Sequence, residues 1–148
     1  MKLSSKSRYA IASLIEMAQA APSQERVTVL SLSQRLDISK IFLEQVFSLL
    51  RRGGLVNSMK GAQGGYQLAR SPEEISVYDI LVETETGLFE RSEPTVGDSA
   101  PGIEQAMREL LFQPLDEALS TALKKVLLSD LAEEAQRQPL DGGYMYYL

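Results

Sequence analysis

The spacing of hydrophobic positions changes within residues 39–70. In the first half, apolar residues recur at the spacing of one helix face, at Leu43, Val46, Phe47 and Leu50. Ser39 is a suitable N-cap, and Gly53-Gly54 ends the segment. Residues 55–59 and 66–69 then predict two strands joined by the glycine-rich turn 60–65. A helix followed directly by such a hairpin predicts a winged helix-turn-helix.

The opposite face of this helix carries hydrogen-bond donors, acceptors and three cations, on Lys40, Glu44, Gln45, Ser48, Arg51 and Arg52. Such side chains read base edges in the major groove of DNA. Charged helix faces of other small α+β domains simply meet water, so this pattern alone leaves both interpretations open. Gly61, Gly64 and Gly65 favour the first, because they allow positive φ and close approach of the loop backbone to another polymer. Lys60 is the cation of that loop.

Two further helices are predicted before this segment. Residues 5–21 form the first, with Ser4 or Ser5 as cap and core positions at Ile11, Leu14, Ile15 and Ala18. Pro22 ends it, and Lys6 and Arg8 in its first turn either point to water or face phosphates. Residues 27–29 favour a third strand, and Ser31 to Gln34 has the form of a capping box that opens a short helix to about Leu36. Asp37-Ile38 makes the turn between the paired helices, whereas Glu25 and Arg26 resemble plain surface.

The chain after the hairpin predicts one short helix and then a loop. Ser76 caps the helix, which contains Val77, Ile80 and Leu81, and Asp79 suits the helix dipole. Residues 86–102 are rich in Gly, Pro and acids and form either a functional loop or a mobile tether.

A long apolar stripe follows from Ile103 to Leu128, where Pro114 should kink or divide the helix. A stripe of this length covers the first helix within the chain or forms an oligomer interface. We favour a homodimer, with Ile103, Met107, Leu110, Leu111, Leu119, Leu123 and Val126 in its interface. Paired recognition helices about 34–36 Å apart would fit successive major grooves.

The C-terminal end predicts a last short helix, capped by Ser129 or Asp130 and ending near Gln138. The aromatic tail, residues 144–148, either packs on its own dimer or docks into another protein. The expected organisation is a winged domain over residues 1–85, a loop over 86–102, and a dimerisation helix, short helix and tail over 103–148. The fold class is therefore mainly α with a small β-sheet.

Charge and composition narrow the function. The net charge of −5 divides into +6 for residues 1–70 and −11 for residues 71–148, so only the half with the helix and hairpin is basic. The chain has no Cys and no His, which excludes disulfides, ordinary zinc sites and His-activated nucleophiles. We expect no metal, no cofactor and no enzymatic activity. Arg8 and Glu16 interrupt the first apolar segment, so we expect a cytoplasmic protein without a signal peptide or membrane span.

The chain also resembles the small bacterial winged-helix regulators of the Rrf type, the family that includes IscR, NsrR and CymR. The similarity lies in residues 1–9, Ile38-Ser39, Leu43-Glu44-Gln45 through Leu50-Arg51, Gly54-Leu55-Val56, Gly61 with Gly64-Gly65-Tyr66, and 71–80. The resemblance implies a homodimer on promoter DNA, with the helix from Ser39 in the major groove and the wing, residues 60–65, in the minor groove. The DNA contacts that it implies fall on Ser39, Ile41, Phe42, Glu44, Gln45, Arg51 and Lys60.

The chain departs from the family pattern at three places. Ile41-Phe42 replaces a small polar residue and a tyrosine of some members. Lys60 stands where IscR has arginine, and lysine fits a narrow minor groove less specifically than arginine does. Residues 90–106 contain none of the three cysteines that hold the cluster of iron–sulfur members. The chain is most similar to CymR among members without a cluster, which implies a repressor of cysteine or sulfur metabolism with cysteine synthase as partner. Such partners typically offer a terminal isoleucine, and this chain ends in Leu148.

Two other classes of function have to be weighed for this sequence. A winged-helix module that binds protein and never DNA would share the fold. An enzyme is disfavoured because the serines lack a histidine base and no phosphate-cradling motif is present.

Overall fold

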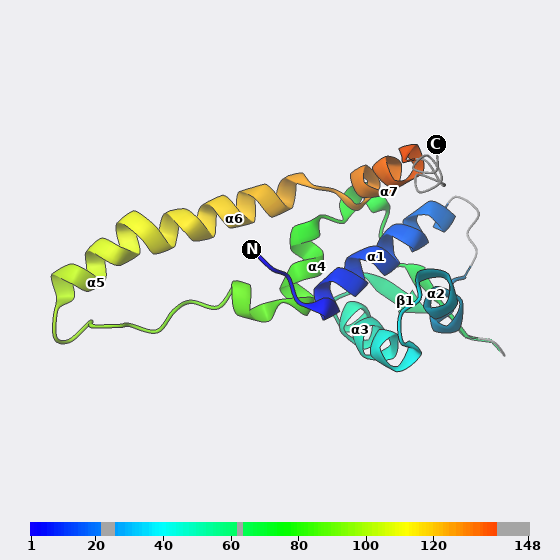
Figure 1. Cartoon of the computed structure of the whole chain (residues 1–148), viewed down its shortest axis with the longest axis horizontal. Coiled ribbons are helices and arrows are strands. Elements are labelled where there is room, and N and C mark those ends of the chain that lie inside the picture. The colour runs from blue at the N-terminus through cyan, green and yellow to red at the C-terminus, as the bar shows by residue number, and fades with distance from the viewer. Residues whose placement is uncertain (22–25, 62–63, 139–148) are drawn as a thin grey trace, which may run out of the picture.

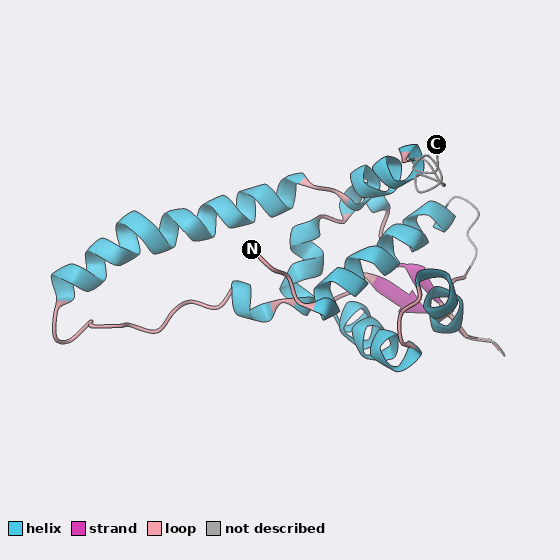
Figure 2. Cartoon of the chain, in the orientation of Figure 1, coloured by secondary structure: helices cyan, strands magenta, loops and turns pink. Residues whose placement is uncertain are grey.

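The computed structural model describes residues 1–21, 26–61 and 64–138. A compact unit carries a projecting helical rod (Figure 1). The elements, coloured by type in Figure 2, are α1 (Ser5–Ala20), α2 (Val29–Leu36), α3 (Lys40–Arg52), β1 (Val56–Ser58), β2 (Tyr66–Leu68), α4 (Val77–Thr84), α5 (Pro101–Met107), α6 (Gln113–Lys125) and α7 (Leu128–Arg137). Short 3-10 turns occupy Pro72–Glu74 and Thr86–Leu88. The predicted class, mainly α with a small sheet, is confirmed.

Polar side chains fix the starts of the helices. Ser4 accepts the backbone N–H of Ser7 at 3.2 Å, and Ser39 accepts that of Phe42 at 3.4 Å, so both predicted caps are confirmed. At α4, Ser76 and Asp79 form a reciprocal capping box. These bonds satisfy N–H groups that have no partner within the helix.

The core lies where α1, α3, α4 and the hairpin meet. Its fully buried members include the predicted stripe of α3, together with Leu14 of α1 and Ile80 of α4. The strands pair antiparallel in the register Val56 with Leu68, Asn57 with Gln67 and Ser58 with Tyr66. Gly54 follows α3 with φ of 75°, a left-handed turn that glycine adopts without strain. α3 and the hairpin therefore share one core.

Two predictions for residues 27–36 are corrected. The third strand is a single bridge, in which Val27 exchanges two backbone hydrogen bonds with Tyr66, at 2.7 and 3.0 Å. Thr28 then caps α2 through a reciprocal pair with Ser31, so the helix begins at Val29 and not at Ser31. Once Val29 is helical, the strand cannot continue. The turn at Asp37 is confirmed, with φ of 56°.

The long helix ends earlier than predicted. It runs from Pro101 to Lys125, and Val126 and Leu127 are extended, because Val126 accepts a 2.8 Å hydrogen bond from Val77 N–H. The π-helical turn Arg108–Phe112 precedes Pro114 and divides the rod into α5 and α6. Figure 1 shows this rod projecting from the unit, with the segment after Thr86–Leu88 running out to its far end.

α7 belongs to the same core as α1. Leu128 and Ala132 of α7 are buried in the main cluster, so the cover over the first helix comes from α7 and not from the long stripe. α7 starts at Leu128, slightly before the predicted cap, because the Asp130 carboxylate accepts the N–H of Leu127 at 3.0 Å. The division at residues 85 and 102 stays a prediction. Predictions for Pro22, Glu25 and the tail from 144 to 148 lie outside the described residues.

No helix in the described ranges is both long enough and apolar enough to cross a membrane.

Candidate nucleic-acid interface

The outer face of α3 presents the predicted polar residues to solvent. Its buried side is fixed by the apolar stripe, so the remaining positions must point outward. The exposed residues on or next to this helix are Ser39, Lys40, Ile41, Glu44, Gln45, Ser48, Arg51 and Arg52. The outer face thus combines side chains that recognise base edges with side chains that recognise phosphates.

Lys40 and Glu44 form an ion pair along this face. Lys40 Nζ lies 3.9 Å from Glu44 Oε1, and both side chains are more than half exposed. Exposed pairs of this kind contribute little to stability because water screens them. Both side chains can therefore exchange this contact for one with a nucleic acid.

The neighbours Ile41 and Phe42 differ in their surroundings. Ile41 is 71% exposed, an unusual position for a large aliphatic side chain. Phe42 is half-buried, and its ring meets Tyr9 of α1 edge to face, with centroids 5.2 Å apart. Ile41 is thus free to touch a ligand, whereas Phe42 ties α3 to α1.

The hairpin loop carries the second set of predicted residues. Lys60 and Gly61 are exposed, and Gly64 is half-buried. Positive φ values of 137° at Gly61, 66° at Gly64 and 116° at Gly65 show that the loop uses conformations that other residues adopt with strain. Residues 62 and 63 of the loop lie outside the described residues.

Lys6 and Arg8 lie exposed near the start of α1, just before Tyr9, whose ring contacts Phe42 of α3. Arg8 donates a 2.9 Å hydrogen bond to the Ser5 hydroxyl. Both side chains add positive charge to the exposed surface of α1.

A polar cluster that the sequence did not indicate anchors the start of α1. Ser7 is fully buried, and its Oγ lies 2.9 Å from Thr84 Oγ1 and 3.0 Å from Glu85 Oε1. The backbone N–H of Ser4 donates to Glu85 at 2.7 Å and is the largest cause of the lowered pKa of that carboxyl. The sequence pattern did not indicate this cluster, because a single serine on the apolar face of a helix usually has no special role.

Arg26 is exposed, as predicted, but it is not plain surface, because it makes specific hydrogen bonds. Its Nη1 lies 3.3 Å from both the Lys60 and the Gly64 carbonyl oxygens, so it bonds the loop of the hairpin. No local pattern indicates this contact, since its partners lie 34 and 38 residues away.

The rod carries exposed apolar side chains on Ile103, Leu110, Leu111 and Leu115. Met107, Leu119 and Leu123 are half-buried, and Val126 lies beyond the end of α6. Toward its C-terminal end the rod packs on α4, where Lys124 Nζ sits 4.6 Å from the centroid of the Tyr78 ring. The apolar side chains nearer its tip have no such cover within the described protomer.

The segment between Phe89 and α5 is held by a buried carboxylate. Glu104 is 6% exposed, and its Oε1 accepts the backbone N–H groups of Thr95 and Val96, each at 2.7 Å. Its Oε2 lies 4.0 Å from Arg108. The segment is therefore held against the rod by hydrogen bonds from its backbone to a side chain of α5.

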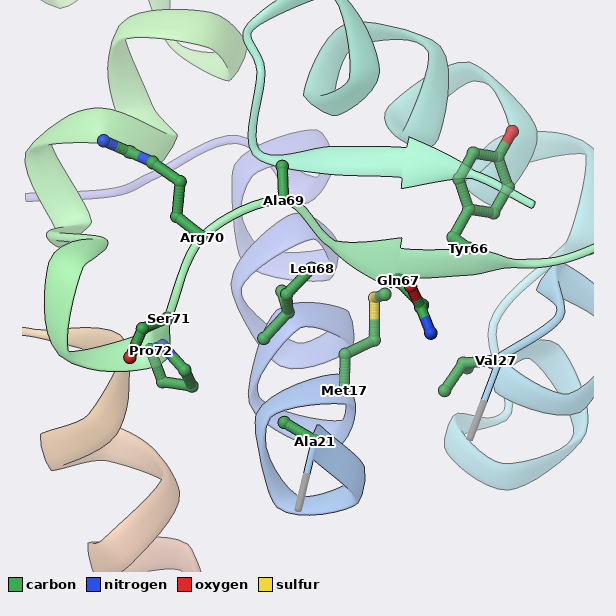
Figure 3. A pocket seen from close by; sticks show the side chains of 10 residues that line it. All are labelled: Met17, Ala21, Val27, Tyr66, Gln67, Leu68, Ala69, Arg70, Ser71 and Pro72. Atoms are coloured by element: carbon green, nitrogen blue, oxygen red, sulfur yellow. The ribbon is translucent and has the colours of Figure 1, made fainter. Parts of the chain in front are cut away.

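A pocket of about 460 Å³ lies between α1 and β2. In Figure 3, Met17 and Leu68 point into it, whereas Tyr66 points to the other side of the hairpin and Arg70 points toward α4. Arg70 there bonds Asp79 at 3.2 Å, and Tyr66 packs on Phe47 of α3. The pocket therefore opens behind the hairpin, away from α3.

Comparisons with known proteins agree on the nature of the chain. Residues 3–134 match the model of a family described as "Rrf2: Iron-dependent Transcriptional regulator". The transcriptional regulator IscR of Cereibacter sphaeroides is 36% identical over 93% of this chain and 90% of its own length.

Two solved structures share the fold. CymR, the global cysteine regulator of B. subtilis, is 33% identical with a TM-score of 0.73, over 90% of this chain and 98% of CymR. IscR of T. potens is 30% identical with a TM-score of 0.72, over 99% of this chain and 97% of that one. The family and these relatives are transcriptional regulators and not enzymes.

Proposed function

The chain belongs to the Rrf2 family of DNA-binding transcriptional regulators, and we propose that it acts as a homodimeric repressor that binds promoter DNA in a sequence-specific way. The observation that supports this most directly is the outer face of α3. There, exposed side chains of the types that can read base edges lie on the same helix as the cations Lys40, Arg51 and Arg52, and the hairpin adds Lys60. A repressor of this kind acts by occupying the promoter.

We assign two kinds of contact to this surface. In the major groove, Ser39, Lys40, Ile41, Phe42, Glu44 and Gln45 lie near the base edges, and Arg51 contacts phosphate. In the minor groove, the wing supplies Lys60 with the backbone at Gly61 and Gly64. Lys6 binds phosphate beside the start of α1. The half-buried ring of Phe42 limits it to an edge contact.

Dimerisation through the rod would give the protein two DNA-binding heads, one winged helix-turn-helix from each protomer. The exposed apolar residues near its tip would be costly left in water and would be covered by the same face of a second copy. The predicted interface set is Ile103, Met107, Leu110, Leu111, Leu119, Leu123 and Val126. Two heads related by a two-fold axis match an operator with two half-sites.

The donor set does not fit the iron of the family description. Iron–sulfur clusters are held by cysteine thiolates, and this chain has neither Cys nor His. Among the residues that the structure describes, no group of three His, Cys, Asp or Glu could hold a metal ion. The buried carboxylate of Glu104, on α5, instead accepts two backbone N–H groups of the preceding segment. The residues of this chain therefore do not fit an iron–sulfur cluster.

The finer role that we propose is control of cysteine or sulfur metabolism. Its support is the similarity to CymR, whose name describes it as a global cysteine regulator, together with the cysteine-free loop. We further propose that cysteine synthase binds the C-terminal tail and conveys the metabolic state. Mixing the two purified proteins, with and without residues 144–148 on the regulator, tests this: loss of the complex on truncation supports the contact, and no complex with the full chain contradicts it.

The function is tested by selecting genomic fragments with the purified protein. We expect a few promoter fragments that share a two-fold symmetric sequence, upstream of sulfur-assimilation genes. Symmetric operators at unrelated genes would refute only the metabolic role. Selected fragments that compete no better than random duplex would favour the alternative, a winged-helix module that binds protein.

A further inference from the structure

We propose that Arg26 is a positioning residue that sets the wing for DNA before DNA arrives. This inference rests on the proposed function, because it concerns how Lys60 reaches the minor groove. Arg26 touches neither base nor phosphate in this reading. Its task is to hold the two arms of the loop at a fixed separation.

The position of Arg26 is fixed by its neighbour in the chain. Val27 exchanges two backbone hydrogen bonds with Tyr66, the first residue of β2. This bridge places the backbone of Arg26 beside the base of the hairpin loop. Arg26 is thereby joined to the wing, although α2 and α3 separate the two in the sequence.

From there the guanidinium bonds both arms of the loop. A single nitrogen, Nη1, lies 3.3 Å from the carbonyl oxygen of Lys60 and 3.3 Å from that of Gly64. Its two N–H groups can serve one carbonyl each. Lys60 belongs to the outgoing arm and Gly64 to the returning arm, so this nitrogen fixes their separation.

The glycines of the loop make room for this side chain. A Cβ at Gly61 would come within 2.9 Å of Arg26 Nη1, and one at Gly65 would come within 3.3 Å of Arg26 Cβ. Both positions also have positive φ, so a side chain there would strain the backbone. We therefore ascribe these two glycines to the accommodation of Arg26 as well as to the turn.

A wing that is held in advance loses less conformational entropy when it binds, and its Lys60 enters the groove from one direction. Arg26 is itself an exposed cation, so a direct phosphate contact is the competing explanation. The two explanations differ in how Arg26 and Lys60 combine. A phosphate contact would act independently of Lys60, whereas a positioning residue would act through it.

A double-mutant cycle on operator affinity separates these explanations. Arg26→Ala and Lys60→Ala are measured alone and together, with the pair Arg26→Ala and Arg51→Ala as matched control. We expect the loss caused by Lys60→Ala to shrink by roughly threefold or more when Arg26 is absent, since residues in one network couple by roughly 2- to 150-fold. In the control pair, the fold-loss of operator affinity in the double variant should equal the product of the fold-losses of Arg26→Ala and Arg51→Ala. Independent effects of Arg26 and Lys60 would overturn the proposal.

A measurement without DNA completes the test. In the free protein, Arg26→Ala should speed hydrogen exchange at the amides of Met59 and Gly64, which bond within the loop, and leave those of β1 unchanged. Unchanged exchange at Met59 and Gly64 would overturn the positioning role even if operator binding is normal. If Arg26→Ala speeds exchange at these amides but the native protein binds no operator, the proposed function is refuted and the contact between Arg26 and the loop is not.

Discussion

Replacement of Leu110 by alanine should dissociate the proposed dimer without unfolding the protomer. Leu110 lies in the π-helical turn of the rod and is 81% exposed, so it contributes little to the protomer's own packing. If a second copy covers it, the dimer holds two newly buried leucines related by the two-fold axis. The substitution should therefore change association and leave the unfolding temperature of the monomer unchanged.

The magnitude follows from the exposed fraction. Full burial of a leucine stabilises by about 1.5–3 kcal/mol, so two copies that are 81% available contribute roughly 2.5–5 kcal/mol to the dimer. Alanine keeps the Cβ, which leaves about three quarters of this at stake. At 1.4 kcal/mol per factor of ten, the dimer Kd should rise roughly 20- to 500-fold.

Sedimentation equilibrium of the DNA-free protein measures this Kd directly. Gln105→Ala is the matched control, because Gln105 is an exposed polar residue of the same rod outside the apolar stripe. A dimer Kd that stays within twofold of the original in Leu110→Ala would refute the interface. Equal weakening by Gln105→Ala would show a general effect on the rod.

Four further predictions concern single side chains. Arg51→Ala should flatten the slope of log operator affinity against log salt by about 0.9 for each protomer, and an unchanged slope would remove Arg51 from the phosphate contacts. Ile41 should contact a thymine methyl, so replacing thymine by uracil at one operator position should weaken the native protein and not Ile41→Ala; equal effects on both proteins would refute this contact. Ser13 Oγ is buried without a hydrogen-bond partner among the described residues, so Ser13→Ala should raise the free energy of unfolding by about 1 kcal/mol. Ser7→Ala should lower the free energy of unfolding, because it removes the hydrogen bonds to Thr84 and Glu85. Denaturant titration measures both changes. Because the pKa of the Glu85 carboxyl is lowered in the folded state, its charged form stabilises the fold above the ordinary carboxyl pKa of 4.5, and this contribution is lost as the pH falls through the folded-state pKa. The difference in the free energy of unfolding between the native protein and Glu85→Ala should therefore narrow below pH 4.5. A difference that is constant with pH would contradict this.

Local patterns predicted the elements whose determinants lie close together in the sequence. The apolar stripe of α3 repeats with the period of a helix, and the residues that cap and end the helix, Ser39 and Gly53, directly flank it in the sequence. The start of α2 was missed because two capping boxes overlap, one from Thr28 to Ser31 and one from Ser31 to Gln34. The bridge between Val27 and Tyr66 makes Thr28 the last extended residue, and that choice depends on a distant strand.

The features missed by sequence analysis depend on long-range contacts. α7 is an ordinary amphipathic helix in the sequence, and nothing local indicates that Leu128 and Ala132 pack in the core with α1. Ser7 and Glu85 form a hydrogen bond across 78 positions, and Arg26 meets the wing across more than 30. Predicted base-reading residues, by contrast, needed only the register of one helix. The exposed face of α3 was therefore predictable, and the contacts that position it were not.

We propose above all that the protein reads base sequence through α3 and the wing. The most direct test of this proposal is an equilibrium titration of the purified protein with a selected operator and with a scrambled duplex of the same length and composition, at physiological salt. We expect the operator to bind about 1,000-fold more tightly than the scrambled duplex, or better, as specific regulators do. Equal affinities for the two duplexes would contradict it.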